Sequence, residues 1–199
     1  VGALAISGLG VTMPFMTILG AFCVGLAVGG STNIAIKLGE GNKEEAEKAL
    51  GNTFAIELLV GIAMVIISIF FLEDILYFFG ASDTTIVYAR EYMQVLLLGN
   101  VITHLYLGLN SVMRAAGYPS KAMYITIVAV VTNIFFNYIF IILMGIGIKG
   151  AALGTICAQT LSLIIVLHHF ITKKESLTFQ KGTFKFIPKI AKQIVSIGL

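Results

Sequence analysis

Charged residues are scarce in this sequence. Only 12% of its 199 residues are Asp, Glu, Lys or Arg, about half of the roughly 25% that is typical of soluble domains. Hydrophobic residues make up 58%. A chain of this length cannot bury so much apolar surface away from water, because small domains leave a large fraction of their surface exposed. We therefore predict an integral membrane protein with lipid as its solvent.

Cysteines and clusters of basic residues are also sparse, which argues against a disulfide-stabilised protein and against a nucleic-acid-binding one. Cys23 and Cys157 lie inside apolar runs, where a free cysteine behaves as a small hydrophobe, so no disulfide framework is indicated. The net charge of +3 is spread along loops without a groove-reading motif, and we predict no nucleic-acid partner. No basic leader precedes the first apolar run, so no cleavable signal peptide is evident. The absence of an initiator Met predicts a segment of a longer chain.

Long uncharged runs dominate the sequence. A helix needs roughly 20 apolar residues to cross the hydrocarbon core, and these runs do not alternate as barrel strands do. The full-length runs are 1–36, 49–72 (interrupted by Glu57), 92–113, 122–148 and 150–172, and a shorter one begins near 186 and stops at 199. We predict an all-α polytopic transmembrane helix bundle with five full spans plus a truncated sixth.

Lys and Arg predict the orientation of these spans. They gather in the loops after the first, third and fifth spans, whereas the loops after the second and fourth hold only Arg90 and Lys149. Cytoplasmic loops carry the excess of Lys and Arg. We therefore expect loops 37–48, 113–121 and 173–192 in the cytoplasm and residue 1 on the external side of the cell membrane.

Local signals mark helix ends and packing faces. Asn42 followed by Glu45 resembles a capping box, and Pro119 suits the start of the fourth span. Pro14 is expected to kink the first span. Small residues at every fourth position let another helix approach closely. They are Gly25 and Gly29 in the first span and Gly150, Gly154, Ala158 and Ser162 in the fifth.

Two spans carry polar residues at helical spacing. Asn133 and Asn137 lie one turn apart on the fourth span, and Thr155 and Gln159 on the fifth. Such residues commonly join helices by hydrogen bonds. They are also compatible with a polar site, since amide and hydroxyl oxygens are ligands that hard cations prefer. Neutral oxygens alone bind a cation weakly, so a carboxylate is expected from elsewhere.

Ionisable residues occur within the membrane segments. His104 lies near the middle of the third span, one turn after Asn100, and an ionisable group at that depth is a functional candidate. It is compatible with a substrate cavity or proton path, and equally with a neutral imidazole bonded to a neighbouring helix. Glu57 is expected to extend toward cytoplasmic water. His168 and His169 are expected to anchor the fifth span at the membrane border.

Four stretches, in order, resemble the multidrug and toxic compound extrusion (MATE) transporters. They are Gly29-Gly30-Ser31 with Lys37-Leu38-Gly39-Glu40-Gly41-Asn42, Phe79-Gly80-Ala81-Ser82, Met113-Arg114-Ala115-Ala116-Gly117-Tyr118-Pro119, and Gly147-Ile148-Lys149-Gly150-Ala151-Ala152-Leu153-Gly154-Thr155. The ending Ile197-Gly198-Leu199 resembles the start of the family's seventh helix. Together these stretches cover nearly the whole chain.

The resemblance implies the second to sixth helices of a twelve-helix transporter with two six-helix lobes. It implies alternating access that exchanges Na⁺ or H⁺, as coupling ion, for a small organic and often cationic substrate. Residues 1–172 would form the bundle of the N-terminal lobe, 173–187 the cytoplasmic inter-lobe linker and 188–199 the amphipathic start of the next helix. The partners would be the lipid bilayer and a C-terminal lobe missing from this sequence; no cofactor is implied.

The resemblance also implies a site. Some members bind a cation in the N-terminal lobe through an Asn on the fifth helix, an acidic residue four positions later, and a Thr on the sixth. Asn133 and Thr155 match this pattern, but Asn137 stands where the acidic residue is expected, which removes a formal charge. The family's first-helix Asp lies outside this sequence. Asn100, His104 and Gln159 are candidates to line the substrate cavity.

Three other functions are alternatives to transport of organic cations. A flippase of the same superfamily, carrying lipid-linked precursors, needs cationic residues against phosphates, and the spans contain no Lys or Arg. An intramembrane enzyme could use Glu57 and the histidines, but no His-Glu-x-x-His spacing occurs. A passive scaffold predicts that alanine at His104, Asn133 or Thr155 affects stability alone. We predict a transporter and not an enzyme.

Overall fold

The computed structural model describes residues 2–172, 177–179, 183 and 186–198. The described residues are almost entirely helical, in agreement with the predicted all-α bundle. The helices are α1 (Ala3–Gly39), α2 (Lys43–Phe70), α3 (Leu72–Phe78), α4 (Ile86–Ala115), α5 (Pro119–Asn137) with a π-helical turn (Tyr138–Leu143), α6 (Ile148–Thr172) and α7 (Pro188–Gly198). Five of these helical segments, α1, α2, α4, α5 with its π-helical turn, and α6, are long and apolar enough to cross a membrane.

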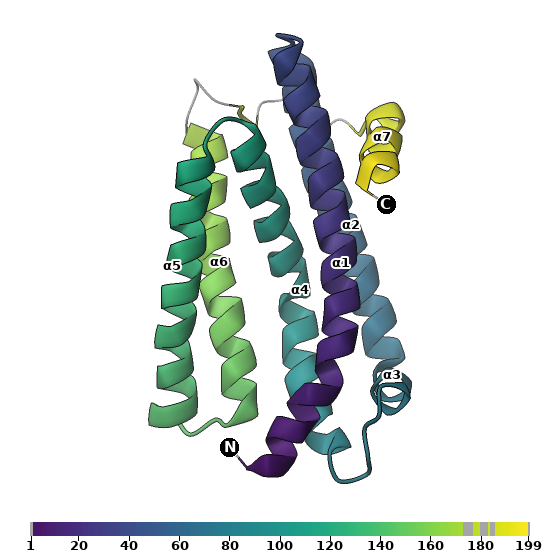
Figure 1. Ribbon diagram of the computed structural model, residues 1–199, viewed down its shortest axis with the longest axis vertical. Helices are drawn as coiled ribbons and strands as arrows, with labels where there is room; N and C mark the ends of the chain where they lie inside the picture. The colour runs from purple at the N-terminus through teal and green to yellow at the C-terminus, as the bar shows by residue number, and fades with distance from the viewer. Residues whose placement is uncertain (1, 173–176, 180–182, 184–185, 199) are drawn as a thin grey trace.

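The five long helices run side by side along the long axis of the molecule, and α7 lies beside α1 and α2 (Figure 1). Helix α4 joins two groups, because it packs against α1 and α2 on one side and against α5 and α6 on the other. Helix α5 turns large apolar side chains outward, and Ile134 and Phe135 are 64% and 60% exposed. Lipid is the solvent that such a face requires.

The predicted helix ends are present. The Asn42 side chain accepts a hydrogen bond from the Glu45 backbone N–H at 3.1 Å and caps α2, and Pro119 occupies the first turn of α5. Pro14 lies inside α1, whose darkest purple N-terminal part leans away from the rest of the helix (Figure 1). Gly117, before α5, has φ of +90°, a conformation that glycine adopts without steric cost.

The predicted small-residue faces receive neighbouring helices. A Cβ on Gly29 would meet the Ile194 carbonyl oxygen of α7, and a Cβ on Gly154 would meet the Asn137 side chain of α5. Helices α1 and α7, and α5 and α6, approach closely because these atoms are absent. The second contact matters for the site, since it brings α5 and α6 together at the depth of the predicted polar residues.

Two features differ from the sequence-based expectations. The short helix α3 lies between the second and third spans, where no helix was predicted. The expectation that Glu57 extends toward water is wrong: its side chain is buried and bonds to His104. Helix α4 supplies both the partner and the space for this carboxyl, because Gly108 lies directly against it.

Parts of the expected linker 173–187 pack back onto the bundle. The Thr178 backbone N–H and hydroxyl both donate to Glu47 Oε1, at 3.2 and 3.1 Å, and the Ile187 N–H donates to Asn52 Oδ1 at 2.8 Å. Residues 173–176, 180–182, 184, 185 and 199 lie outside the described residues. The division into bundle, cytoplasmic linker and next helix stays a prediction.

Candidate functional site

Helices α5 and α6 bring three of the predicted site residues together. Asn133 Nδ2 donates to Thr155 Oγ1 at 3.1 Å, and Asn137 Nδ2 donates to Asn133 Oδ1 at 3.1 Å. Asn133 and Asn137 share a face because they lie one helical turn apart. Gly154, next to Thr155 on α6, lets α5 approach closely enough for these bonds. The three residues form one hydrogen-bonded chain, which we call the amide–hydroxyl cluster.

An open-sided cavity of about 290 Å³ lies beside this cluster, between α4, α5 and α6. Asn133, Thr155 and Gln159 are among its lining residues. Gln159 Oε1 accepts a hydrogen bond from the Thr103 hydroxyl at 2.5 Å, which joins Gln159 on α6 to α4. Apart from Thr126, the other lining residues are apolar or aromatic. A mostly apolar wall with a few convergent polar groups is typical of sites that orient a bound molecule.

The cluster offers oxygen ligands without formal charge. Asn133 Oδ1 and Thr155 Oγ1 have lone pairs beyond those their bonds occupy, and the buried Asn137 Oδ1 has no hydrogen-bond partner among the described residues. Hard cations prefer such oxygens. With Asn137 in place of a carboxylate, the described residues supply no negative charge within the cluster.

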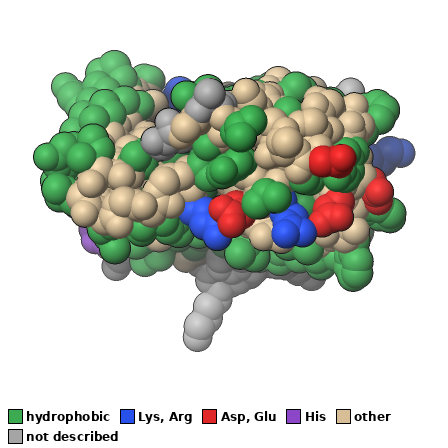
Figure 2. Space-filling view, turned by 90° about the horizontal axis from the view of Figure 1, so that it is seen from below, with side chains coloured by type: hydrophobic (Ala, Val, Ile, Leu, Met, Phe, Trp, Pro, Cys, Tyr) green, Lys and Arg blue, Asp and Glu red, His purple; other side chains and the backbone are tan. Residues whose placement is uncertain are grey.

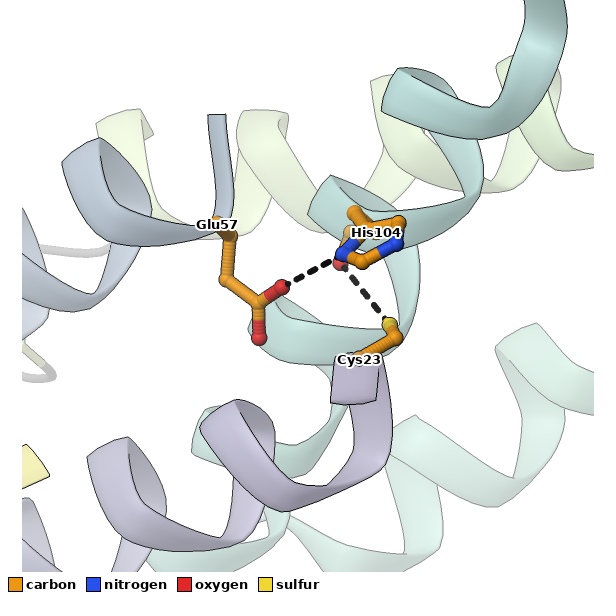
Figure 3. A group of neighbouring side chains, drawn as sticks. All are labelled: Cys23, Glu57 and His104. Carbon is orange, nitrogen blue, oxygen red and sulfur yellow. Dashed lines mark hydrogen bonds and ion pairs between the residues drawn. The ribbon is translucent and has the colours of Figure 1, made fainter. Parts of the chain in front are cut away.

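His104 and Glu57 form a second polar group, on the other side of α4. His104 Nδ1 and Glu57 Oε2 are 3.2 Å apart, and each side chain is 1% exposed. Cys23 Sγ on α1 lies 4.0 Å from the His104 carbonyl oxygen, and Figure 3 shows the three side chains converging. The Glu57–His104 contact was not predicted from the sequence. A carboxylate this deep in a span was the available signal, because such groups face a partner inside the bundle.

The remaining predicted residues lie apart from the cavity. Asn100 is buried on α4, one turn from His104, and neither is among the cavity's lining residues. Their assignment to a substrate cavity stays a prediction. At the end of α6, His168 is exposed, and the His169 ring packs at 4.9 Å from the Tyr118 ring.

The sequence matches one known protein family. A family model described as MatE matches residues 1–139 of this sequence, well over half of it. The chain belongs to the MatE family. It is similar to the multidrug export protein MepA of Staphylococcus saprophyticus, with 26% identity over 97% of this chain and 43% of that protein. The MepA of Staphylococcus haemolyticus is 28% identical over 98% of this chain and 43% of its own length.

Solved structures of the MatE family have the same fold. An inward-facing multidrug resistance MATE family transporter matches with a TM-score of 0.93 and 25% identity over 99% of this chain. An outward-facing one matches with a TM-score of 0.92, also at 25% identity over 99% of this chain. The chain covers 45% and 44% of those two structures. The chain therefore spans less than half the length of each structure, and the matched part has nearly the same shape in the inward-facing and outward-facing transporters.

Proposed function

We propose that this chain is the N-terminal lobe of a multidrug exporter that exchanges Na⁺ or H⁺ for small organic, mainly cationic compounds by alternating access. The observation that carries the proposal is the direct Asn133–Thr155 bond beside an open-sided cavity. These two residues come from different helices and would be free to point apart if each served only its own helix. MatE relatives that are multidrug export proteins support the substrate class.

The near-equal match to inward- and outward-facing structures supports a rocking mechanism. If the lobe keeps its internal packing in both states, alternating access arises from rotation of one lobe against the other. The tight contact of α5 with α6 at Gly154 supports such internal rigidity. The cavity between α4, α5 and α6 would then form one wall of the substrate passage, and the C-terminal lobe the other.

Charge supports the proposed orientation. At one end of the bundle Arg90 pairs with Glu73 at 2.7 Å, and Lys149 pairs with Glu91 at 3.2 Å. Figure 2, which views the molecule from below, shows acidic side chains beside the few basic ones at this end. The opposite end holds the loops with residues 37–48 and 113–121, which carry more Lys and Arg. We place these loops in the cytoplasm and residue 1 on the external side of the cell membrane.

Two other functions receive less support. A flippase for lipid-linked precursors needs cationic side chains facing phosphates in the cavity, and the cavity beside the amide–hydroxyl cluster has none among its lining residues. An intramembrane hydrolase needs a nucleophile and a base that a substrate can reach. Glu57 and His104 are both fully enclosed, which argues against this use.

Transport by the full-length protein that contains this lobe, in reconstituted vesicles, tests the proposal. Vesicles are loaded with a fluorescent organic cation, and Na⁺ and H⁺ gradients are imposed and collapsed separately. We expect efflux to depend on one of the two gradients. Efflux that persists with both gradients collapsed would overturn the coupling, and failure to move any organic cation would overturn the substrate class.

A further inference from the structure

Three different metal-binding side chains meet in the enclosed half of the bundle. Cys23, Glu57 and His104 come from α1, α2 and α4, and one ligand atom from each lies within 4.8 Å of the others. Each residue is 1% exposed. Figure 3 shows the carboxyl group and the thiol approaching the imidazole from two separate helices. The cavity beside the amide–hydroxyl cluster involves none of the three.

We propose that Cys23, Glu57 and His104 bind one divalent cation of the zinc type, which joins α1, α2 and α4. The donor set decides the class of ion. A thiolate and an imidazole suit Zn²⁺ and its relatives, whereas Na⁺, Mg²⁺ and Ca²⁺ take oxygen ligands. Sulfur, nitrogen and carboxylate oxygen are the three donors that protein zinc sites use.

Charge balance favours a cation with two positive charges. An apolar interior disfavours a net charge, so without a metal ion the group is most stable when it is neutral, with one proton on the thiol and one in the Glu57–His104 pair. Binding releases both protons, and one thiolate and one carboxylate then neutralise one M²⁺ ion. The group is neutral before and after this exchange of two protons for one divalent cation.

The geometry lies near that of a coordinated ion. His104 Nδ1 and Glu57 Oε2 are already 3.2 Å apart, close to the roughly 3.3 Å that separates nitrogen and oxygen ligands around tetrahedral zinc. The sulfur of Cys23 would need to move inward by on the order of 1 Å to complete the set. The buried Glu57 Oε1 has no hydrogen-bond partner among the described residues, which leaves a carboxylate oxygen for the ion.

The backbone of the neighbouring helices makes room for these ligands. A Cβ on Gly108 would lie 2.9 Å from Glu57 Oε1, and a Cβ on Gly61 would lie 3.5 Å from the His104 Cβ. Both positions are glycine, so the carboxyl and the imidazole fit between α2 and α4. Because the group is enclosed, the ion would be a resident one, distinct from a coupling ion that must enter and leave in each cycle. The inference therefore does not depend on the proposed transport.

Cadmium binding by the purified protein tests this inference, since Cd²⁺ forms a thiolate complex with an ultraviolet charge-transfer band. The protein, whose sequence contains the two cysteines Cys23 and Cys157, is stripped of metal with a chelator and titrated with Cd²⁺. We expect one Cd²⁺ per chain, the charge-transfer band, and its loss when Zn²⁺ is added in competition. C23S should abolish the band, and E57Q and H104Q should each weaken binding more than about tenfold.

Cys157 provides the matched control, because it is a half-buried free cysteine on α6, away from the group. C157S should keep the full band and stoichiometry. The proposal is overturned if C157S binds no Cd²⁺, or if C23S keeps the band. The C157S titration needs no substitution in the group itself, so it decides the question even if C23S fails to fold.

Discussion

Asn133 on α5 donates its side-chain N–H to the hydroxyl of Thr155 on α6, across 3.1 Å. The two residues are separated by 22 positions in the chain, yet they meet beside the cavity between α4, α5 and α6. A single interhelical bond of this kind contributes about 0.6 kcal/mol to stability. A role in transport can therefore be distinguished from a role in packing by comparing the loss of efflux with the loss of free energy of unfolding in the same variant.

Replacing Thr155 with valine keeps the shape of the side chain and removes the acceptor for Asn133. We expect T155V to lower efflux by at least about tenfold while the free energy of unfolding falls by about 0.6 kcal/mol. Efflux from vesicles and thermal unfolding in detergent measure the two effects. T160V is the control, because within the described part of the chain the Thr160 hydroxyl bonds only to the Ile156 carbonyl of its own helix, and it should transport normally. An equal loss of efflux in T155V and T160V would contradict a role for the amide–hydroxyl cluster in transport.

Asn137 is the position where a carboxylate would complete the amide–hydroxyl cluster. Asn137 already bonds to Asn133, so N137D would place a negative charge beside the oxygens of Asn133 and Thr155. Charge and oxygen ligands together raise affinity for hard cations. We expect N137D to bind Na⁺ more tightly than the parent protein, as measured by ²²Na⁺ binding. N137Q, which stays neutral, should not change Na⁺ binding. Identical binding by N137D and N137Q would argue against a cation site here.

Gly29 tests the contact between α1 and α7. A Cβ at this position would meet the Ile194 carbonyl oxygen and lie 3.0 Å from the Gly198 nitrogen. We expect G29A to lower the free energy of unfolding by about 1–3 kcal/mol, since overpacking forces the backbones apart. G20A, on the same helix with nothing within 4 Å of its added Cβ, should leave stability unchanged or slightly raised. Thermal unfolding of both variants would show whether α7 is held by this close approach.

The sequence predicted the spans well because charge is nearly excluded from hydrocarbon. Helices α4 and α6 extend the predicted uncharged runs 92–113 and 150–172 to Ile86–Ala115 and Ile148–Thr172. The difference arises because charged residues such as Arg114 and Lys149 sit in the terminal turns, where they reach water. The cap at Asn42 was predictable because it depends on only a few consecutive residues. Helix α3 is too short to give a periodic signal.

The candidate site was only partly predictable. Spacing placed Asn133 and Asn137 on one face, but only the family resemblance paired them with Thr155. The partner of His104 was missed because helical periodicity reports which residues share a face and not which helix that face meets. Glu57 lies 47 positions from His104, and only the packing of α2 against α4 brings them together. The role of Gly108, which leaves room for this carboxyl, could not be predicted either, because it also depends on the packing of α2 against α4.

The Glu57–His104 pair predicts a measurable coupling in the free energy of unfolding. The experiment is a double-mutant cycle with E57Q, H104Q and the double variant, in protein stripped of metal ions. Because both side chains are 1% exposed, either single change leaves a buried polar group with an impaired partner. The interaction energy should therefore lie in the range of about 0.5–3 kcal/mol seen for contacting residues.

The surface pair Glu73–Arg90, 2.7 Å apart with both side chains roughly half exposed, is the control, and its cycle should give about 0.2–1 kcal/mol. Additive effects at Glu57 and His104 would mean that the two residues stabilise the bundle independently, and the contact between α2 and α4 would then rest on apolar packing.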